Sequence, residues 1–330
     1  MTMNANDLLL DIRELTIHYV TDNGTVHAVE GLNLELGRGE TLGLVGETGA
    51  GKTTTALGIT RLLPVPPGVV RGGQILFDGE DVLLKDEEEM RSIRGGKIAM
   101  IFQDPMTSLN PVMTVDKQVA EMIKLHRKVS ESEALEQAAE MLDLVGIRRE
   151  RLRDYPHQFS GGMKQRVVIA IALACDPKLL IADEPTTALD VTIQAQVLEL
   201  MKNLKRQFGT SMILITHDLG IVAETCDKVG IMYAGRLVEY GDTKSLYDNP
   251  NHPYTVGLFK SVPDLEEDCD ELSVIPGLMP DPMDLPSGCA FHPRCSHAEE
   301  ACSRERPVMI EIEPGHFIAC PVRARALGKA

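Results

Sequence analysis

The chain contains no tryptophan, and aromatic residues make up only 4% of its 330 residues. It therefore lacks the aromatic side chains on which single-stranded nucleic acids stack. Positive charge is also scarce: 33 lysines and arginines stand against 49 aspartates and glutamates, a formal net charge of −16. A chain this acidic is repelled by phosphate backbones and by anionic lipid, so we expect no nucleic-acid partner. It can still reach a membrane by docking on an embedded partner.

Long apolar runs are missing as well. None approaches the roughly 18 residues of a membrane-spanning helix. The longest, such as 167–175 and 179–182, have the size of core elements. The first residues carry Asp7 and Asp11 and no basic segment, so we expect no secretory signal. The cysteine count is odd, at seven, which favours a reducing compartment over a disulfide framework.

The length predicts about two domains, and the hydrophobic pattern indicates the order of their elements. Strand and helix alternate from Leu179 onward, which predicts a parallel sheet. From Asn249 onward prolines interrupt the chain repeatedly, and we expect irregular structure there. Strands are predicted at 8–20, 26–36, 41–45, 72–79, 97–103, 179–182 and 212–216, and helices from the glycine-rich loop to about residue 63, at 114–146 and at 191–208.

A glycine-rich segment follows the predicted strand 41–45 and opens a helix. It fits the P-loop pattern of Gly, four residues, Gly-Lys-Thr. Glycines let backbone N–H groups converge on phosphate oxygens, and the helix N-terminus adds partial positive charge there. Lys52 can then bridge the β- and γ-phosphates, and the Thr53 hydroxyl can hold Mg²⁺. This context favours a phosphate site over an ordinary glycine-rich turn. The segment reads Gly46-Glu47-Thr48-Gly49-Ala50-Gly51-Lys52-Thr53.

Two acidic residues end the apolar strand 179–182. Asp183 is placed to hold the Mg²⁺ of a P-loop site. Glu184 is placed to orient or deprotonate an attacking water. The alternative is a buried strand that happens to end in acidic residues, and the P-loop upstream favours the functional interpretation.

Between these motifs, Ser160-Gly161-Gly162 opens an apolar helix. A serine at a helix start with free glycine amides is a second anion site. A chain with one P-loop needs such a site only if two chains share their nucleotides. The pattern therefore indicates a pair of chains with nucleotides between them.

The order of these motifs resembles that of the ATP-binding-cassette (ABC) ATPases, and the resemblance covers about residues 8–245. It implies an α/β fold of the P-loop NTPase class. A RecA-like core with a parallel sheet would carry an antiparallel β subdomain and a helical subdomain at about 105–176. We expect an ATPase domain at 1–248 and a Cys-rich C-terminal extension at 249–330.

The resemblance also implies roles for individual residues. Glu184 would be the catalytic glutamate, Gln103 the glutamine that senses the γ-phosphate and reaches Mg²⁺, and His217 the switch histidine. Met163 stands where the commonest signature has glutamine, which leaves the phosphate-binding glycine amides unaffected. The alternative to the switch role of His217 is a local hydrogen bond, and the alternative to adenine stacking by Tyr19 is simple packing. Further contacts to ATP and Mg²⁺ are implied for Tyr19 (stacked on adenine), Thr53, Thr54, Ser160, Gly161, Gly162, Asp183 and Asp190, the last in the subunit-contact loop 188–190.

Three further segments narrow the resemblance. They are 103–111 (QDPMTSLNP), 190–196 (DVTIQAQ) and 252–255 (HPYT). They look like the peptide-importer subfamily, the ATPases of dipeptide and oligopeptide permeases. Nickel and glutathione importers share much of this pattern, so these cargoes stay as alternatives.

The subfamily resemblance implies a set of partners and a mechanism. The ATPase would lie at the cytoplasmic face of the inner membrane, with two permease subunits and a second ATPase subunit, either a paralogue or another copy. A periplasmic or extracellular binding protein would hold the peptide. ATP binding would close the ATPase pair and hydrolysis would reset it. A soluble cassette ATPase of DNA repair or translation is opposed by the charge and the tail, and a small-molecule kinase leaves Ser160–Gly162 and His217 unexplained.

Four of the cysteines crowd the last part of the chain with the spacing C-x₅-C-x₆-C-x₁₇-C. Four thiolates can close an S₄ metal site, although the tight C-x₂₋₄-C pairs of zinc sites are missing. The subfamily resemblance implies a [4Fe–4S] cluster, which some members carry; zinc and unligated packing cysteines are the alternatives. The four are Cys289, Cys295, Cys302 and Cys320, whereas Cys175, Cys226 and Cys269 lack a partner nearby in sequence and are expected to be core or surface thiols.

Overall fold

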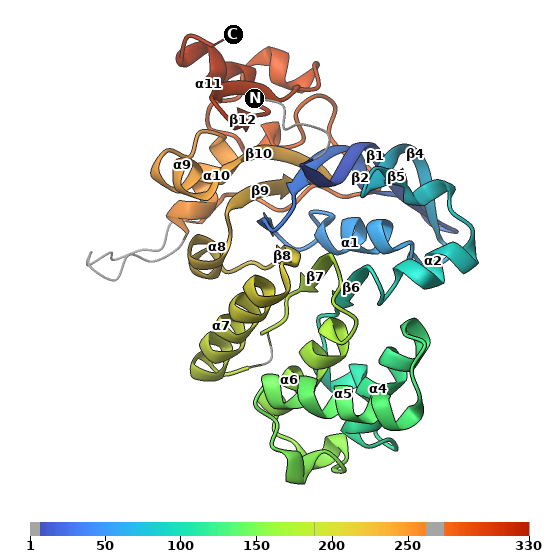
Figure 1. Cartoon of the computed structure of the whole chain (residues 1–330). Coiled ribbons are helices and arrows are strands. Elements are labelled where there is room, and N and C mark those ends of the chain that lie inside the picture. The colour runs from blue at the N-terminus through green and yellow to red at the C-terminus, as the bar shows by residue number, and fades with distance from the viewer. Residues whose placement is uncertain (1–6, 188, 262–273, 330) are drawn as a thin grey trace.

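The computed structural model describes residues 7–187, 189–261 and 274–329, and within these residues the strands form two sheets (Figure 1). The smaller sheet is antiparallel, with the strand order β2-β1-β4-β5. It confirms the expected antiparallel subdomain, and β4 begins four residues earlier than the pattern predicts. Its strands are β1 (Leu8–Thr21), β2 (Gly24–Gly37), β4 (Gly68–Phe77) and β5 (Glu80–Asp81).

The larger sheet has the order β11-β12-β10-β9-β3-β8-β7-β6, and the strands from β9 to β6 are parallel. Because β3 lies between β8 and β9, the loop that follows β3 leaves the middle of the parallel region. The carboxyl ends of β7 and β8 lie at the same edge, which is where such sheets bind ligands. The strands are β3 (Thr41–Val45), β6 (Ile98–Ile101), β7 (Leu179–Asp183), β8 (Ser211–Ile215), β9 (Lys228–Tyr233), β10 (Arg236–Asp242), β11 (Ile310–Glu313) and β12 (His316–Ile318).

The helices surround this sheet, and α4, α5 and α6 form a helical layer at the opposite end of the molecule from α11 (Figure 1). The predicted helix 114–146 is two helices, because Ser130 and Glu133 form a capping box that starts a new one. The helices are α1 (Lys52–Thr60), α2 (Glu87–Ile93), α3 (Pro105–Ser108), α4 (Val115–His126), α5 (Glu131–Leu144), α6 (Gly161–Leu173), α7 (Val191–Phe208), α8 (Leu219–Thr225), α9 (Thr243–Asp248), α10 (Pro253–Lys260) and α11 (Pro321–Ala326). None of these described helices combines the length and the apolar character needed to cross a bilayer.

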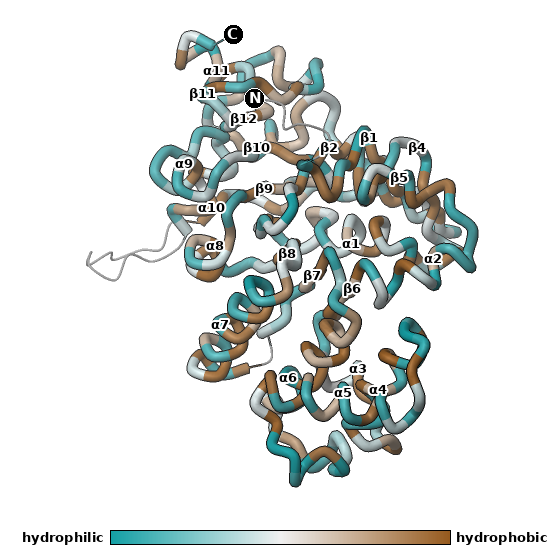
Figure 2. The backbone as a smooth tube through the Cα atoms, in the orientation of Figure 1, coloured by the Kyte–Doolittle hydropathy of each residue, from teal (hydrophilic) through white to brown (hydrophobic). Residues whose placement is uncertain are grey.

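The parallel strands are buried on both faces, and each face belongs to a different core. On β7, Leu180 and Ala182 join the core that includes the helical layer. Leu179 and Ile181 point to the other face and join the core under the antiparallel sheet. Figure 2 shows the corresponding contrast between brown strands and α7, which alternates between brown and teal. Burial on both faces explains why these strands read as continuous apolar runs.

The C-terminal residues continue the larger sheet, where the prolines predict irregular structure. The hairpin of β11 and β12 pairs with β10 through Glu239 and Tyr240. Glu239 is fully buried and accepts a hydrogen bond from His316 at 2.8 Å. The backbone N–H groups of Asn251 and His252 donate to the same carboxylate, each at 2.8 Å. The extension is therefore anchored on the ATPase sheet by a buried and well-bonded carboxylate.

Candidate nucleotide-binding and catalytic site

The P-loop connects β3 to α1 in a conformation that requires glycine. Gly49 and Gly51 have φ values of 85° and 98°, in the left-handed region. A Cβ on Gly51 would lie 2.3 Å from the carbonyl oxygen of Ala28, and one on Gly46 would lie 2.2 Å from that of Met232. No side chain of the described residues caps α1, so the N–H groups of its first turn are free to bind an anion.

Lys52 reaches back into this loop. Its Nζ donates to the carbonyl oxygens of Gly46 at 2.6 Å and Glu47 at 3.1 Å. Burial lowers the pKa of Lys52, while the nearby carboxylates of Glu184, Asp183 and Glu47 oppose that shift. A buried ammonium among carboxylates and free N–H groups is suited to phosphate oxygens. Within the loop Thr48 and Gly49 are exposed at the tip, and Ala50 is buried beneath them.

Two of the three predicted Mg²⁺ ligands, Asp183 and Thr53, meet in the structure, whereas the third, Gln103, is hydrogen-bonded to Glu184. Asp183, at the end of β7, is 3% exposed. Burial raises its pKa, and a hydrogen bond from the Thr53 side chain, at the start of α1, opposes the rise. A carboxylate and a hydroxyl side by side are oxygen donors of the kind that Mg²⁺ prefers.

Glu184 is bonded at both carboxylate oxygens. Oε2 accepts from Gln103 Nε2 at 2.8 Å and from the Thr187 hydroxyl at 3.0 Å. Oε1 lies 3.2 Å from His217 Nδ1. Burial alone would raise the pKa of Glu184, but the hydrogen bonds from His217, Thr187 and Gln103 outweigh it, and the pKa lies below its ordinary value. These hydrogen bonds thus keep the Glu184 carboxylate ionised and fix its orientation.

The backbone at Glu184 is strained. Its φ is 46°, a left-handed value that is rare for a residue with a Cβ. Such strain costs roughly 1–3 kcal/mol and persists where the surroundings enforce it, often at active sites. The structure thus brings together the three residues predicted as catalytic, and Thr187 joins them as a contact that the sequence motifs do not indicate.

Tyr19 and Thr54 lie beside each other, as expected for neighbours of a bound nucleotide. The Tyr19 hydroxyl, on β1, is 3.3 Å from the Thr54 hydroxyl on α1. The ring therefore stands next to the P-loop helix. Stacking on adenine stays a prediction.

The second predicted anion site lies apart from the P-loop of the same chain. Ser160 caps α6 by accepting a 3.4 Å hydrogen bond from the backbone N–H of Met163, and Asp190 caps α7 at Ile193. Within the described residues, no hydrogen bond joins Ser160–Gly162 or Asp190 to the P-loop. Ala188, part of the predicted subunit-contact loop, lies outside the described residues. A separate second site is what a shared nucleotide requires.

Gly162 packs tightly on α7, which gives a testable effect on stability. A Cβ at this position would lie 2.4 Å from Cγ2 of Ile193. We expect Gly162→Ala to lower the free energy of unfolding by about 1–3 kcal/mol, because the added methyl overpacks the contact. Urea unfolding measures this, with Gly161→Ala in the same helix as the control, because a Cβ there would meet nothing closer than 3.5 Å. Adding Ile193→Ala should recover most of the Gly162→Ala loss; no recovery would contradict the steric explanation.

A second cluster of ligand-type residues lies on the antiparallel sheet. His18 and His27 both contact Glu30 Oε1, at 2.5 and 2.8 Å. Arg236 and Arg306 approach Glu30 Oε2 at 3.4 and 3.8 Å. The two guanidinium groups disfavour binding of a metal cation at this cluster. We interpret it as a hydrogen-bonded junction between the antiparallel sheet and the C-terminal residues. The alternating strand pattern did not indicate it.

The four C-terminal cysteines influence one another electrostatically. Burial raises the pKa of Cys289 to about 11, and the neighbouring Cys320, Cys302 and Cys295 add to the rise. The Cys289 N–H also donates to the carbonyl of Cys302 at 2.8 Å. The structure therefore brings together the four cysteines that the spacing singled out. Cys226 is buried and Cys175 partly buried, as expected for packing thiols, and Cys269 lies outside the described residues.

The fold and the site together define a P-loop ATPase of the cassette type. A central strand delivers the P-loop, the next strand but one delivers Asp183 and Glu184, and a helical layer carries Ser160. Residues 29–187 match the family described as "ABC transporter", and residues 238–302 match "Oligopeptide/dipeptide transporter, C-terminal region".

Whole-length relatives agree with these matches. The chain is 52% identical over 326 residues to the "Probable peptide ABC transporter ATP-binding protein y4tR" of Sinorhizobium fredii, covering 97% of each chain. It is 50% identical over 316 residues to the "Oligopeptide transport ATP-binding protein OppD" of Escherichia coli, covering 95% of this chain and 93% of that one.

Solved structures show the same fold. The cbiO1 subunit from Clostridium perfringens, part of the ABC transporter complex cbiONQ, superposes with a TM-score of 0.63 at 30% identity, covering 76% of this chain and 95% of that one. The dimeric ATP-binding cassette MJ0796 bound to ADP and Pi gives 0.64 at 26% identity, covering 71% of this chain and 98% of that one. The chain belongs to the ATP-binding subunits of peptide-type ABC transporters, and it is an ATPase of that family.

Proposed function

We propose that this chain is the ATPase subunit that powers import of dipeptides or oligopeptides through a membrane permease. The observation that carries the proposal is the arrangement around Glu184, a carboxylate bonded at both oxygens beside a P-loop lysine. The match of residues 238–302 to the oligopeptide/dipeptide C-terminal region, and the names of the relatives, support a peptide cargo.

The chain's own residues supply most of the mechanism. Lys52 and the N–H groups at the start of α1 bind the phosphates, and Thr53 and Asp183 would hold Mg²⁺, which would neutralise charge that develops on the phosphates. Glu184 accepts a hydrogen bond from the attacking water and orients it in line with the γ-phosphate. Gln103 and His217 hold that carboxylate in place, and Gln103 would also sense the γ-phosphate while His217 would act as the switch histidine.

A second ATPase subunit, either a copy or a paralogue, completes the site. Ser160–Gly162 of one subunit would face the P-loop of the other, because the segment makes no hydrogen bond with its own P-loop in the described residues. ATP then contributes contacts that only the closed pair makes, and hydrolysis removes them. We assign residues 1–248, with a helical subdomain at about 105–176, to this engine and 249–330 to the extension.

A groove next to Gln103 offers a place for a permease subunit. It has a volume of about 300 Å³ and lies between the core sheet and the helical layer. Phe102, 44% exposed, lines it together with Met100, Met122 and Ile171. An apolar groove one residue from a γ-phosphate sensor is suited to passing closure to a membrane partner. Each of two permease subunits would occupy one such groove, and the ATPase pair would lie at the cytoplasmic face of the membrane.

Uptake measurements test the cargo. Cells that lack the chain should lose uptake of a radiolabelled tripeptide or dipeptide, and the wild-type chain should restore it. A chain carrying Glu184→Gln should not restore it. Loss of nickel or glutathione uptake with unchanged peptide uptake would instead assign those cargoes, and a periplasmic or extracellular binding protein should be needed for any of them.

For the four cysteines we propose a [4Fe–4S] cluster. Backbone N–H groups of Phe291, His297 and Arg323 donate to the sulfurs of Cys289, Cys295 and Cys320, respectively, which favours thiolate ligands. Tetrahedral zinc, at about 2.3 Å from each ligand, would hold the sulfurs roughly 3.8 Å apart. Within the described residues the one group of three ligand atoms that all lie within 4.8 Å of one another is His18, His27 and Glu30, so no three of the cysteine sulfurs are that close together, as one zinc ion would hold them. A cluster needs that wider spacing because each cysteine binds a different iron.

Metal analysis tests the cluster. We expect anaerobically purified protein to contain about four iron atoms per chain and Cys295→Ser to lose most of them, because one thiolate ligand is missing. Cys175→Ser, which removes a partly buried thiol elsewhere, is the matched control and should keep its iron. Stoichiometric zinc without iron in the wild type would replace the cluster with a zinc site.

A further inference from the structure

Glu47, the second residue of the P-loop, is held by two side chains of the C-terminal extension. Its carboxylate accepts from both terminal nitrogens of Arg294, at 2.8 and 3.2 Å. Its backbone N–H donates to the Tyr254 hydroxyl at 2.9 Å. Tyr254 is fully buried, and the side chain of Arg294 is only 6% exposed. A bidentate and shielded pair of this kind is stronger and more directional than a surface ion pair.

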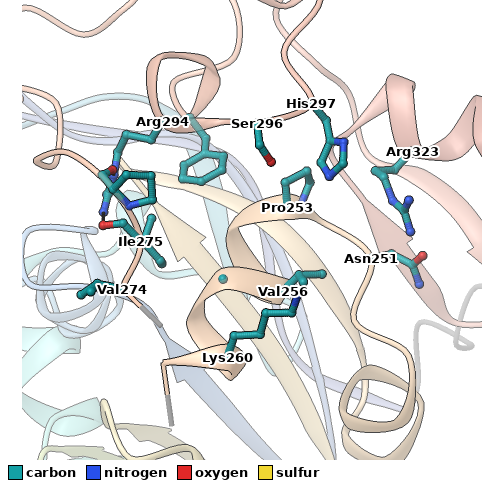
Figure 3. A pocket seen from close by; sticks show the side chains of 13 residues that line it. Asn251, Pro253, Val256, Lys260, Val274, Ile275, Arg294, Ser296, His297 and Arg323 are labelled. Atoms are coloured by element: carbon teal, nitrogen blue, oxygen red, sulfur yellow. Dashed lines mark hydrogen bonds between the residues drawn. The ribbon is translucent and has the colours of Figure 1, made fainter. Parts of the chain in front are cut away.

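The remaining contacts of Arg294 fix the direction of its guanidinium. Nε donates to the carbonyl of Pro276 at 2.9 Å, and Nη1 lies 3.3 Å from the Tyr233 hydroxyl. Figure 3 shows Arg294 beside Ile275 at the edge of a pocket of about 310 Å³, with His297 on the other side. Arg294 is therefore preorganised toward Glu47, and little side-chain freedom is lost in holding it.

The charge of Glu47 matters for nucleotide binding. Its carbonyl accepts from Lys52, and its carboxylate is close enough to oppose, with Glu184 and Asp183, the fall in the pKa of that lysine that burial causes. A carboxylate this close to the phosphate-binding ammonium repels a triphosphate unless it is neutralised. Among the described residues, Arg294 is the ion-pair partner of Glu47.

We propose that Arg294 is a positioning residue of the nucleotide site, with Tyr254 as its helper. Arg294 neutralises Glu47 and, with Tyr254, fixes the P-loop backbone at that residue, so that the C-terminal extension sets the affinity for ATP. This inference rests on the ATPase function proposed above.

The position of Arg294 in the chain extends the consequence to the cysteines. It is the last residue of the short 3-10 helix His292–Arg294, which lies between Cys289 and Cys295. The N–H groups of Arg294 and Cys295 are both bonded within this segment, to Phe291 and His292. The conformation of the cysteine segment therefore fixes the position of the Arg294 side chain, which contacts the P-loop directly.

A double-mutant cycle on the full-length chain tests the proposal. Binding of a fluorescent ATP analogue and steady-state ATPase activity are measured for Arg294→Met, Glu47→Gln and the double variant. We expect Arg294→Met to raise Kd and KM about 10- to 100-fold with kcat within about threefold, since it leaves a carboxylate unpaired in the loop. In the double variant that carboxylate is neutral, so Kd should return to within about threefold of Glu47→Gln alone.

Conservative variants and a control separate positioning from folding. Arg294→Lys keeps the charge but not the fork, and should fall between wild type and Arg294→Met. Tyr254→Phe should raise Kd by a few-fold through the lost Glu47 contact. Arg304→Met, at an exposed arginine of the same extension that pairs with Glu300, should change nothing. Thermal unfolding and metal content report on the fold of each variant.

The outcomes distinguish this inference from the proposed function. A wild-type chain that neither binds nor hydrolyses ATP would remove the function itself. A wild-type chain that binds ATP, together with Arg294→Met of unchanged Kd, overturns the positioning role alone. The same holds if the double variant binds as weakly as Arg294→Met, because the loss would then come from general disruption of the extension.

Discussion

Glu184→Gln is expected to lower ATP turnover by about 10²- to 10⁴-fold while leaving the affinity for ATP close to that of the wild type. The amide keeps the shape of the side chain and can still contact Gln103 and Thr187. It cannot accept a proton from water or carry the negative charge that orients it. The phosphates are bound elsewhere, by Lys52 and the start of α1, so affinity is not at stake.

Single-turnover hydrolysis and nucleotide binding, measured on the same preparation, check this prediction. Glu224→Gln is the matched control, because this glutamate is 77% exposed and forms an ion pair with Lys202, away from the nucleotide site. ATP should also trap Glu184→Gln as a closed pair, detectable by size-exclusion chromatography. Turnover near the wild-type rate would remove Glu184 from the catalytic role and leave His217 or Gln103 to position the water.

The parts of the site that the sequence predicts are those encoded locally. The P-loop, the Asp183–Glu184 pair and Ser160–Gly162 each sit in a few consecutive residues, and the strand or helix next to them fixes their direction. Strands buried on both faces, such as β7, are also recognisable, because residues 179–182 of this strand are all apolar and only its last residue, Asp183, is charged. The split between α4 and α5 was encoded locally too, in the Ser130 capping box, but the helical composition on either side concealed it.

The parts that could not be predicted depend on contacts distant in sequence. Glu47 and Arg294 are 247 positions apart, and neither sits in a pattern that points to the other. The hairpin of β11 and β12 has only four and three residues, too few for an alternating pattern. The composition of the C-terminal tail suggests a segment separate from the ATPase domain, but Arg294 contacts Glu47 of the P-loop. Variants in the cysteine segment are therefore expected to affect ATP binding as well as metal content.

Lys52→Ala should weaken ATP binding by about 10- to 150-fold, because charge-assisted contacts to phosphate oxygens are worth roughly 1.5–3 kcal/mol. The lysine is 8% exposed, and the carboxylates of Asp183 and Glu184 are close enough to act on its charge. Its removal takes the counter-charge from both, so the site becomes more repulsive to a triphosphate in addition to losing a contact.

Titration with a fluorescent ATP analogue measures the Lys52→Ala effect, and Lys124→Ala, at an exposed lysine of α4, is the control. Measuring both Kd and the free energy of unfolding distinguishes two roles for Lys52. As a phosphate ligand, its loss raises Kd and KM together, and excess ATP restores part of the turnover. As a structural plug that only bonds the carbonyls of Gly46 and Glu47, its loss would leave Kd unchanged and lower the free energy of unfolding instead. We expect the first result. The free N–H groups at the start of α1 favour binding of an anion in this loop, and that anion would also contact the Lys52 ammonium.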